Sequence, residues 1–243
     1  MKYAVLVVLA ASFAVGCNGD PSADNGKGID QPADCPECAA ASGTVGQGAI
    51  LPDFSFQGFV DGNLQHTTLS TIGLWDFYNP HAGDPTYQPA DPKDDDRLFP
   101  VGSPYNPDPT TQTPKPTALL IDIASVWCGP CNEEARNTLN GLYAKYKPCG
   151  GEFVFQLAEG SAPGVAVTEQ TLQAWVSMYH VTYPATWDPA KQLFPLYSAD
   201  SFPDSAIVDT RSMLVVDVIS GVPDTTFWSK YESLLDPTCL AGK

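Results

Sequence analysis

The sequence predicts an α/β domain in which helices cover both faces of one central mixed β-sheet. Two apolar runs with strand character, at 117–124 and 152–158, are each followed by a segment with helical periodicity, as in parallel strands joined by helical crossovers. Two further strands, at 205–208 and 213–219, are separated by a short turn and precede a final helical segment. Because a short turn joins antiparallel strands, this order of elements indicates a sheet with strands of both directions.

A β-hairpin is the first expected element of the domain. Residues 54–57 alternate between apolar and polar side chains, residues 61–63 (Asp-Gly-Asn) are a turn signal, and residues 64–67 can supply the return strand. The apolar segment at 69–78 is expected to include at least one helical turn. The hairpin is therefore an N-terminal extension of the predicted sheet.

A long insertion is predicted at 79–116. The segment is rich in Pro and Asp and has no sustained apolar period, so neither a helix nor a central strand can run through it. Its acidic stretch at 91–96 lacks the spacing of a calcium-binding loop, and we interpret it as a solvated turn. Tyr87, Phe99 and Tyr105 are expected to attach the insertion to the domain.

The predicted helices have start signals and one apolar face. Residues 131–146 place apolar side chains at helical spacing, and Thr168 can cap a second helix. Residues 191–197 are a shorter helical piece, and Asp224 can cap the last helix.

The charge balance narrows the range of partners. The 243 residues include 28 Asp and Glu against 12 Lys and Arg, which gives a net charge of −16 at pH 7. Lys and Arg form no cluster, so we expect neither nucleic acid nor an anionic membrane surface as a partner. The negative charge is interpreted as keeping an exported protein soluble.

Residues 1–16 are expected to be a signal peptide. The uncharged, mostly apolar stretch at 3–15 has the length of a signal-peptide core and is too short to span a bilayer comfortably. It ends in Ala-Val-Gly-Cys, which resembles the lipobox of bacterial lipoproteins, although Leu is usual where Ala14 stands. That resemblance implies lipidation of Cys17, and cleavage by ordinary signal peptidase is the alternative. Residues 17–48, rich in Gly, Ala, Ser, Asp and Pro, are then a lipidated flexible tether.

The pentapeptide at 127–131, Trp-Cys-Gly-Pro-Cys, is the strongest functional signal in the chain. It stands where the apolar strand gives way to a helix, whose unpaired N–H groups can stabilise a thiolate. Cys128 is expected to be exposed and to be the attacking thiol. Cys131, one turn into the helix, is expected to be buried and to resolve the mixed disulfide. Trp127 is expected to cover one side of the site.

The other cysteines suit an oxidising compartment, because six remain when Cys17 is set aside. Cys149 and Cys239 each follow a predicted helix, and we expect them to form a structural disulfide, although the four cysteines outside the pentapeptide allow three pairings. Cys35 and Cys38 form a second C-x-x-C, read as a local disulfide, with electron relay or metal binding as alternatives. Neither a zinc ligand set nor spaced histidines accompany it, so no metal is predicted.

Asp122 is a candidate proton-transfer residue. It lies in the otherwise apolar strand that precedes Cys128, where desolvation should raise its pKa and allow it to exchange a proton with Cys131. A carboxylate satisfied by local hydrogen bonds is the alternative.

These features make the chain similar to the thioredoxin-like superfamily, and it specifically resembles the periplasmic, membrane-anchored thiol-disulfide oxidoreductases of the TlpA/ResA type. The resemblance is carried by the pentapeptide, by Leu-Pro-Asp-Phe at 51–54 and by Phe-Pro-Asp-Ser-Ala-Ile-Val-Asp at 202–209. It covers residues 50–236 apart from the insertion, and it implies a thioredoxin-like domain at 49–243 in the bacterial cell envelope. The insertion and Ser212, where a turn glycine is usual, depart from the family pattern.

The resemblance also bears on two site residues. Asp122 matches the buried acid of thioredoxins. Pro203 aligns with the cis-proline that faces the dithiol, where backbone groups could pair briefly with a substrate strand. An ordinary trans proline in a loop is the alternative for Pro203.

The predicted function is that of a tethered thiol-disulfide oxidoreductase without a cofactor. Its Gly-Pro dipeptide resembles that of thioredoxin, which favours action as a reductant. The expected partners are protein thiol or disulfide substrates, an upstream thiol electron donor, and the membrane through the lipid anchor. Three alternatives remain: a copper-delivery protein of related fold, a non-catalytic envelope binding or scaffold protein, and a thiol peroxidase. The copper-delivery family has one more residue between its two cysteines than this chain has.

Overall fold

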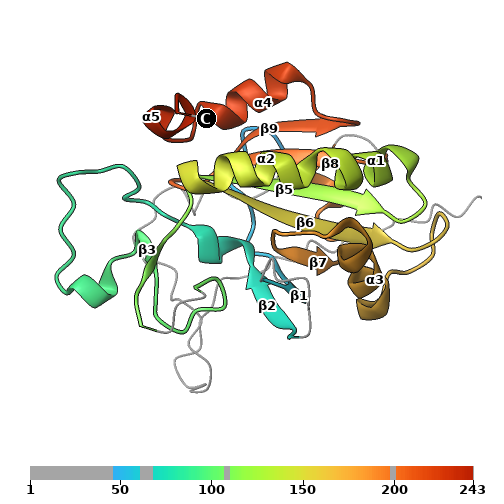
Figure 1. Cartoon of the computed structure of the whole chain (residues 1–243), viewed down its shortest axis with the longest axis horizontal. Helices are drawn as coiled ribbons and strands as arrows, with labels where there is room; N and C mark the ends of the chain where they lie inside the picture. Colours follow the sequence, from blue (N-terminus) through green and yellow to red (C-terminus); the bar gives the residue numbers. More distant parts are fainter. Residues whose placement is uncertain (1–45, 61–67, 107–109, 198–200, 243) are drawn as a thin grey trace, which may run out of the picture. The chain divides into compact units, whose positions relative to one another are not determined.

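The computed structural model describes residues 46–60, 68–106, 110–197 and 201–242 (Figure 1). The predicted signal peptide, Cys17, the cysteines at 35 and 38, and the return strand expected at 64–67 lie outside these residues. Within the described part of the chain, no helix has the length and apolar character needed to cross a membrane.

One mixed sheet of seven strands forms the centre of the domain. In spatial order its strands are β2 (Ser70–Gly73), β1 (Ser55–Phe59), β7 (Ala185–Trp187), β6 (Gly151–Glu159), β5 (Ala118–Ser125), β8 (Asp204–Asp209) and β9 (Leu214–Ser220). Strands β5, β6 and β7 are parallel, while β1 and β8 run antiparallel to their neighbours. An N-terminal hairpin is present as the antiparallel pair β1 and β2.

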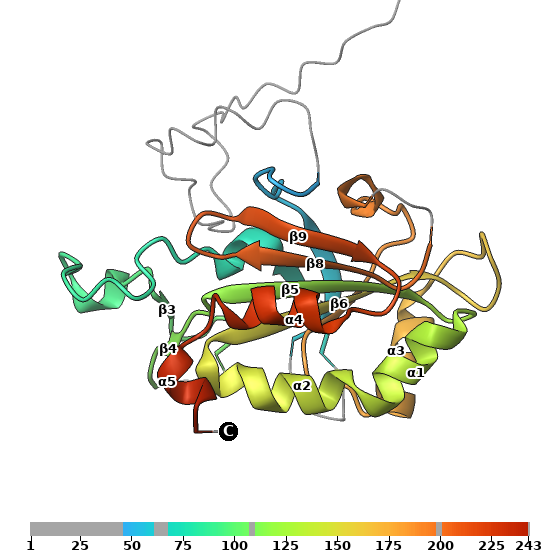
Figure 2. The same cartoon turned by 90° about the horizontal axis from the view of Figure 1, so that it is seen from above.

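Helices cover both faces of the sheet, which confirms the predicted fold class (Figure 2). The α-helices are α1 (Gly129–Asn137), α2 (Leu139–Tyr146), α3 (Glu169–Tyr179), α4 (Thr225–Glu232) and α5 (Pro237–Leu240), and the first four pack on one face. The opposite face is covered by short 3-10 helices, η2 (Leu74–Phe77) and η5 (Phe194–Leu196). Two apolar clusters result because successive side chains of a strand point to opposite faces, as Leu120 and Ile121 do.

The helix starts follow their predicted signals, but one predicted helix is divided. The side chains of Thr168 and Asp224 accept the N–H groups of Thr171 and Phe227 at the starts of α3 and α4. The helix expected over 131–146 is interrupted at Thr138, whose φ of −123° leaves the helical region. A β-branched residue adopts helical geometry at a small cost, which is consistent with a break there.

The insertion is ordered by its own short elements. Strands β3 (Leu98–Phe99) and β4 (Thr113–Pro114) pair with each other, and η3 (Pro92–Asp94) occupies the acidic stretch. Phe99 and Tyr105 pack on Phe77 of the domain, as expected, and the Tyr105 hydroxyl donates to Asp76. Tyr87 instead stacks on His81 inside the insertion. Among the described residues, no group of three or more His, Cys, Asp or Glu could hold a metal ion.

A disulfide joins Cys149 and Cys239, the pair expected from the sequence. Cys149 ends η4 (Lys147–Cys149), directly after α2, and Cys239 lies in α5. The two Cα atoms are 5.4 Å apart, and the Asp236 N–H donates to the Cys149 carbonyl beside the bond. The C-terminal helix is thereby fixed to the end of the α1–α2 pair.

Candidate active site

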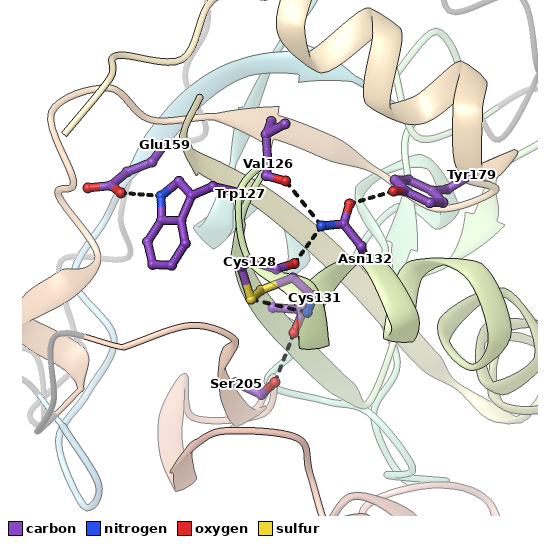
Figure 3. The surroundings of a disulfide bond; sticks show 9 residues. Val126, Trp127, Cys128, Cys131, Asn132, Glu159, Tyr179 and Ser205 are labelled. Carbon is purple, nitrogen blue, oxygen red and sulfur yellow. Dashed lines mark hydrogen bonds between the residues drawn. A yellow bond between two sulfur atoms is a disulfide. The ribbon is translucent and has the colours of Figure 1, made fainter. Parts of the chain in front are cut away.

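The candidate site is the disulfide between Cys128 and Cys131 at the junction of β5 and α1 (Figure 3). Cys128 is the N-cap of α1, and its Sγ accepts the Cys131 N–H at 3.1 Å. The disulfide therefore sits among N–H groups that carry the positive end of the helix dipole. In the reduced protein, the same N–H group can stabilise a Cys128 thiolate.

Cys128 is buried, which corrects the expectation that it would be exposed. Its exposed fraction is 2%, the same as that of Cys131. Both cysteines belong to the apolar cluster on the helical face of the sheet, and Phe202, distant in sequence, packs against that cluster. Trp127 then meets the Phe202 ring edge-on, with ring centroids 5.8 Å apart.

Trp127 borders the site on the solvent side and is held by Glu159. The side chain is 41% exposed, and its Nε1 donates to Glu159 Oε2 at 2.7 Å. Glu159 also forms an ion pair with Lys191. Burial disfavours the ionised form of Glu159, but hydrogen bonds from Lys191 and Trp127 outweigh it and hold the pKa of this carboxyl below its usual value.

A surface pocket of about 510 Å³ opens beside Trp127. Its lining is mostly apolar, and the opposed charges of Glu159 and Lys191 compensate each other at its wall. The lining residues are Trp127, Glu159, Pro163, Lys191, Phe194 and Phe202.

Asp122 is a buried carboxyl on the helical face of β5. It lies between Leu120 and Ala124 in the alternation of the strand, and both neighbours pack in the cluster that contains the two cysteines. The Ser205 hydroxyl on β8 donates to Asp122 Oδ1 at 2.9 Å. Burial raises the pKa of Asp122 strongly, more than the bond from Ser205 lowers it.

Glu134 is a second buried acid, which the sequence analysis missed. It lies one turn beyond Cys131 on α1 and is 4% exposed, and neither carboxylate oxygen has a hydrogen-bond partner among the described residues. Burial raises the pKa of Glu134, and the nearby charge of Asp122 raises it further. Its spacing from Cys131, three residues along a helix, was the available signal.

Asn132 is another site residue that the sequence analysis missed. Its Nδ2 donates to the carbonyl oxygens of Val126, at 3.1 Å, and Cys128, at 2.5 Å (Figure 3). Its Oδ1 accepts the Tyr179 hydroxyl at 2.5 Å. One amide side chain therefore links both ends of the turn before α1 to the last residue of α3.

Pro203 follows a cis peptide bond with Phe202 and directly precedes β8. Its carbonyl accepts the Gly221 N–H at 2.7 Å, and proline has no N–H of its own. A carbonyl oxygen has two lone pairs, so pairing of this region with a substrate strand stays a prediction.

No protein-family profile matches the sequence, and no curated protein matches it either. Solved structures do match. A putative thiol:disulfide interchange protein DsbE from Chlorobium tepidum has 17% identity and a TM-score of 0.50, over 81% of this chain and 99% of that chain. The thioredoxin domain of a thiol-disulfide oxidoreductase from Bacteroides vulgatus has 12% identity and a TM-score of 0.48, over 79% and 99%. An exposed lipoprotein thioredoxin from Streptococcus pneumoniae has 15% identity and a TM-score of 0.45, over 75% and 98%.

The first of these likenesses concerns the fold. It spans nearly the whole of the other chain. The described domain has a thioredoxin-like fold, with the Cys128–Cys131 disulfide at the start of its first α-helix.

Proposed function

We propose that this thioredoxin-like chain is a thiol-disulfide oxidoreductase that acts as a reductant of disulfides in exported proteins. The supporting observation is the geometry of the couple: Cys128 caps α1 and accepts the Cys131 N–H. Two buried acids, Asp122 and Glu134, are placed on the same helical side of the sheet. A nucleophile stabilised as an anion and a proton acceptor for its partner are the two requirements of dithiol chemistry.

The proposed reaction has two exchange steps. In the reduced protein, the Cys128 thiolate attacks one sulfur of a substrate disulfide, which forms a mixed disulfide and releases the other substrate sulfur as a thiolate. Cys131 then passes its proton to a buried acid, and its thiolate attacks Cys128 Sγ. The mixed disulfide breaks, the Cys128–Cys131 disulfide forms, and the second substrate thiolate leaves. Two electrons pass to the substrate, whose thiolates take up protons from solvent while the buried acid returns its proton to solvent, and an upstream thiol donor restores the dithiol.

The surface around the couple supports protein segments as substrates. Three large apolar side chains at this end of the sheet are exposed to solvent. They are Trp127, Val165 and Val222, each more than 40% exposed. The Val165 carbonyl accepts the N–H of Gly160, which follows Glu159. Val222 follows Gly221, whose N–H donates to the Pro203 carbonyl. With the apolar pocket beside Trp127, they form a surface suited to an extended segment that carries a bulky apolar residue next to its cysteine.

The function includes export and attachment to the bacterial cell envelope. In this proposal residues 1–16 direct export, Cys17 carries the lipid, residues 17–48 are the tether, and the thioredoxin-like domain spans 49–243 with its insertion at 79–116. Replacement of Cys17 by Ser is expected to move the protein from the membrane fraction to the soluble fraction. Retention of the Cys17→Ser protein in the membrane would contradict lipid anchoring.

The decisive test is reduction of insulin disulfides by the wild type and by two single variants. Cys128→Ser is expected to abolish the reaction, whereas Cys131→Ser should accumulate a mixed disulfide with insulin because the resolving thiol is gone. Undiminished insulin reduction by Cys128→Ser would refute the assignment. A reduced wild type that binds one equivalent of Cu(I) but leaves insulin oxidised would replace the proposal with copper delivery.

A further inference from the structure

Asn132 occupies the centre of a hydrogen-bond network beside the Cys128–Cys131 pair. Its amide nitrogen donates to two carbonyl groups, those of Val126 and Cys128, which flank Trp127 in the turn between β5 and α1. The backbone N–H of Asn132 also donates to the Cys128 carbonyl, at 3.1 Å. The orientation of the peptide group of Cys128 is therefore held by two donors from one residue.

The orientation of the Asn132 amide is itself fixed by Tyr179. A side-chain amide can present either its oxygen or its nitrogen in a given direction, and the partner of the oxygen decides which. The Tyr179 hydroxyl donates to Asn132 Oδ1, so the nitrogen is turned toward the two carbonyl groups (Figure 3).

Tyr179 is well suited to fix another side chain, because it is held on several sides. It is 7% exposed, its ring packs against Trp175 with centroids 4.6 Å apart, and its carbonyl accepts Asn140 Nδ2 at 2.9 Å. Asn140 lies on α2, so Tyr179 is fastened to the helical layer independently of the turn. The rigid end of α3 is thereby connected through one hydroxyl to the backbone that carries the attacking cysteine.

We propose that Asn132, oriented by the Tyr179 hydroxyl, is a positioning residue that holds the turn so that the Cys131 N–H stays directed at Cys128 Sγ. This inference rests on the proposed function for its meaning, since that N–H group stabilises the thiolate on which exchange depends. Asn132 and Tyr179 act through the backbone and contact neither sulfur.

The test is the pH dependence of alkylation of Cys128 by iodoacetamide in the fully reduced protein. Asn132→Ala and Tyr179→Phe are each expected to raise the midpoint, by about 0.5 to 1 pH unit, because a thiolate that loses a hydrogen bond for part of the time is less stabilised. The double variant should shift the midpoint no further than Asn132→Ala alone, since the hydroxyl acts through the amide. Tyr179→Phe keeps the ring packing and provides the test if Asn132→Ala fails to fold.

Asn140→Ala is the matched control, because it also removes a side-chain amide that bonds to Tyr179 but leaves the Tyr179 hydroxyl on Asn132 and the ring packing on Trp175 in place. It is expected to lower the melting temperature while leaving the midpoint at the wild-type value. Wild-type midpoints in Asn132→Ala and Tyr179→Phe, or an equal shift in Asn140→Ala, would overturn the proposal. The midpoint is measured on Cys128 itself, so a protein that fails to reduce insulin but shows these shifts refutes only the proposed function.

Discussion

The two disulfides of the domain differ in the length of chain that they close, and this difference predicts unequal contributions to stability. Cys149–Cys239 closes a loop with a sequence separation of 90, whereas Cys128–Cys131 closes one of 3. Constraint of the unfolded chain by the longer loop is worth about 4.6 kcal/mol at 25 °C. On the same relation the shorter loop gives about 1.6 kcal/mol.

The matched pair of variants is Cys149→Ala with Cys239→Ala, and Cys128→Ala with Cys131→Ala. Cys128, Cys131 and Cys149 are 2% exposed and Cys239 is half-buried, so the cavity cost is smaller for the Cys149 and Cys239 pair and opposes the difference expected from loop length. On loop length alone, the variant without the longer loop should be less stable than the other by about 3 kcal/mol in the free energy of unfolding. Part of this difference is lost if the unfolded chain keeps residual structure.

The assay is urea unfolding followed by circular dichroism, with the slope of each transition compared to ensure that the unfolded states are alike. Equal free energies of unfolding for the two double variants, or a reversed order, would refute the reasoning from loop length. If peptide mapping of the wild type showed no Cys149–Cys239 disulfide, the premise of this prediction would be wrong.

Three further results are expected. Burial raises the pKa of Glu134 in the folded protein, so the unfolded chain ionises first and the free energy of unfolding falls as pH rises above about 4.5. Glu134→Gln should flatten this fall. Identical urea midpoints for variant and wild type across the pH range would contradict the prediction. Asp122→Asn should slow resolution of the mixed disulfide by roughly 10²-fold, seen by rapid quenching, and an unchanged rate and pH profile would exclude proton transfer through Asp122. Glu159→Gln weakens the hold on Trp127 and should raise the KM for insulin more than it lowers kcat, whereas an effect on kcat alone would contradict a role at the binding surface.

The order of elements was predictable from the sequence because it depends on local patterns. Strand β5 is a continuous apolar run, and α3 and α4 begin at capping residues. Strand β7 was not predicted because three residues are too few to show a period, and it is a strand only because β1 and β6 lie on either side of it.

The reactive pair was predictable from its spacing, but its environment was not. Phe202, which meets the Trp127 ring edge-on, reaches the site from another part of the chain. Asn132 has an ordinary polar character in the sequence, and its hydrogen bond with Tyr179 exists only after α1 and α3 have packed. Contacts between segments that are distant in sequence leave no periodic signal.

The helical pair α1 and α2 separates two sulfur bridges that would otherwise be able to scramble. One bridge lies at the first turn of α1 and the other follows the end of α2, so the helical residues between them have a combined length of roughly 25 Å at about 1.5 Å per residue. Thiol-disulfide exchange requires sulfur atoms to come into bonding contact. While these helices are folded, the Cys128–Cys131 pair is held away from the Cys149–Cys239 bridge, which opposes intramolecular exchange between the two.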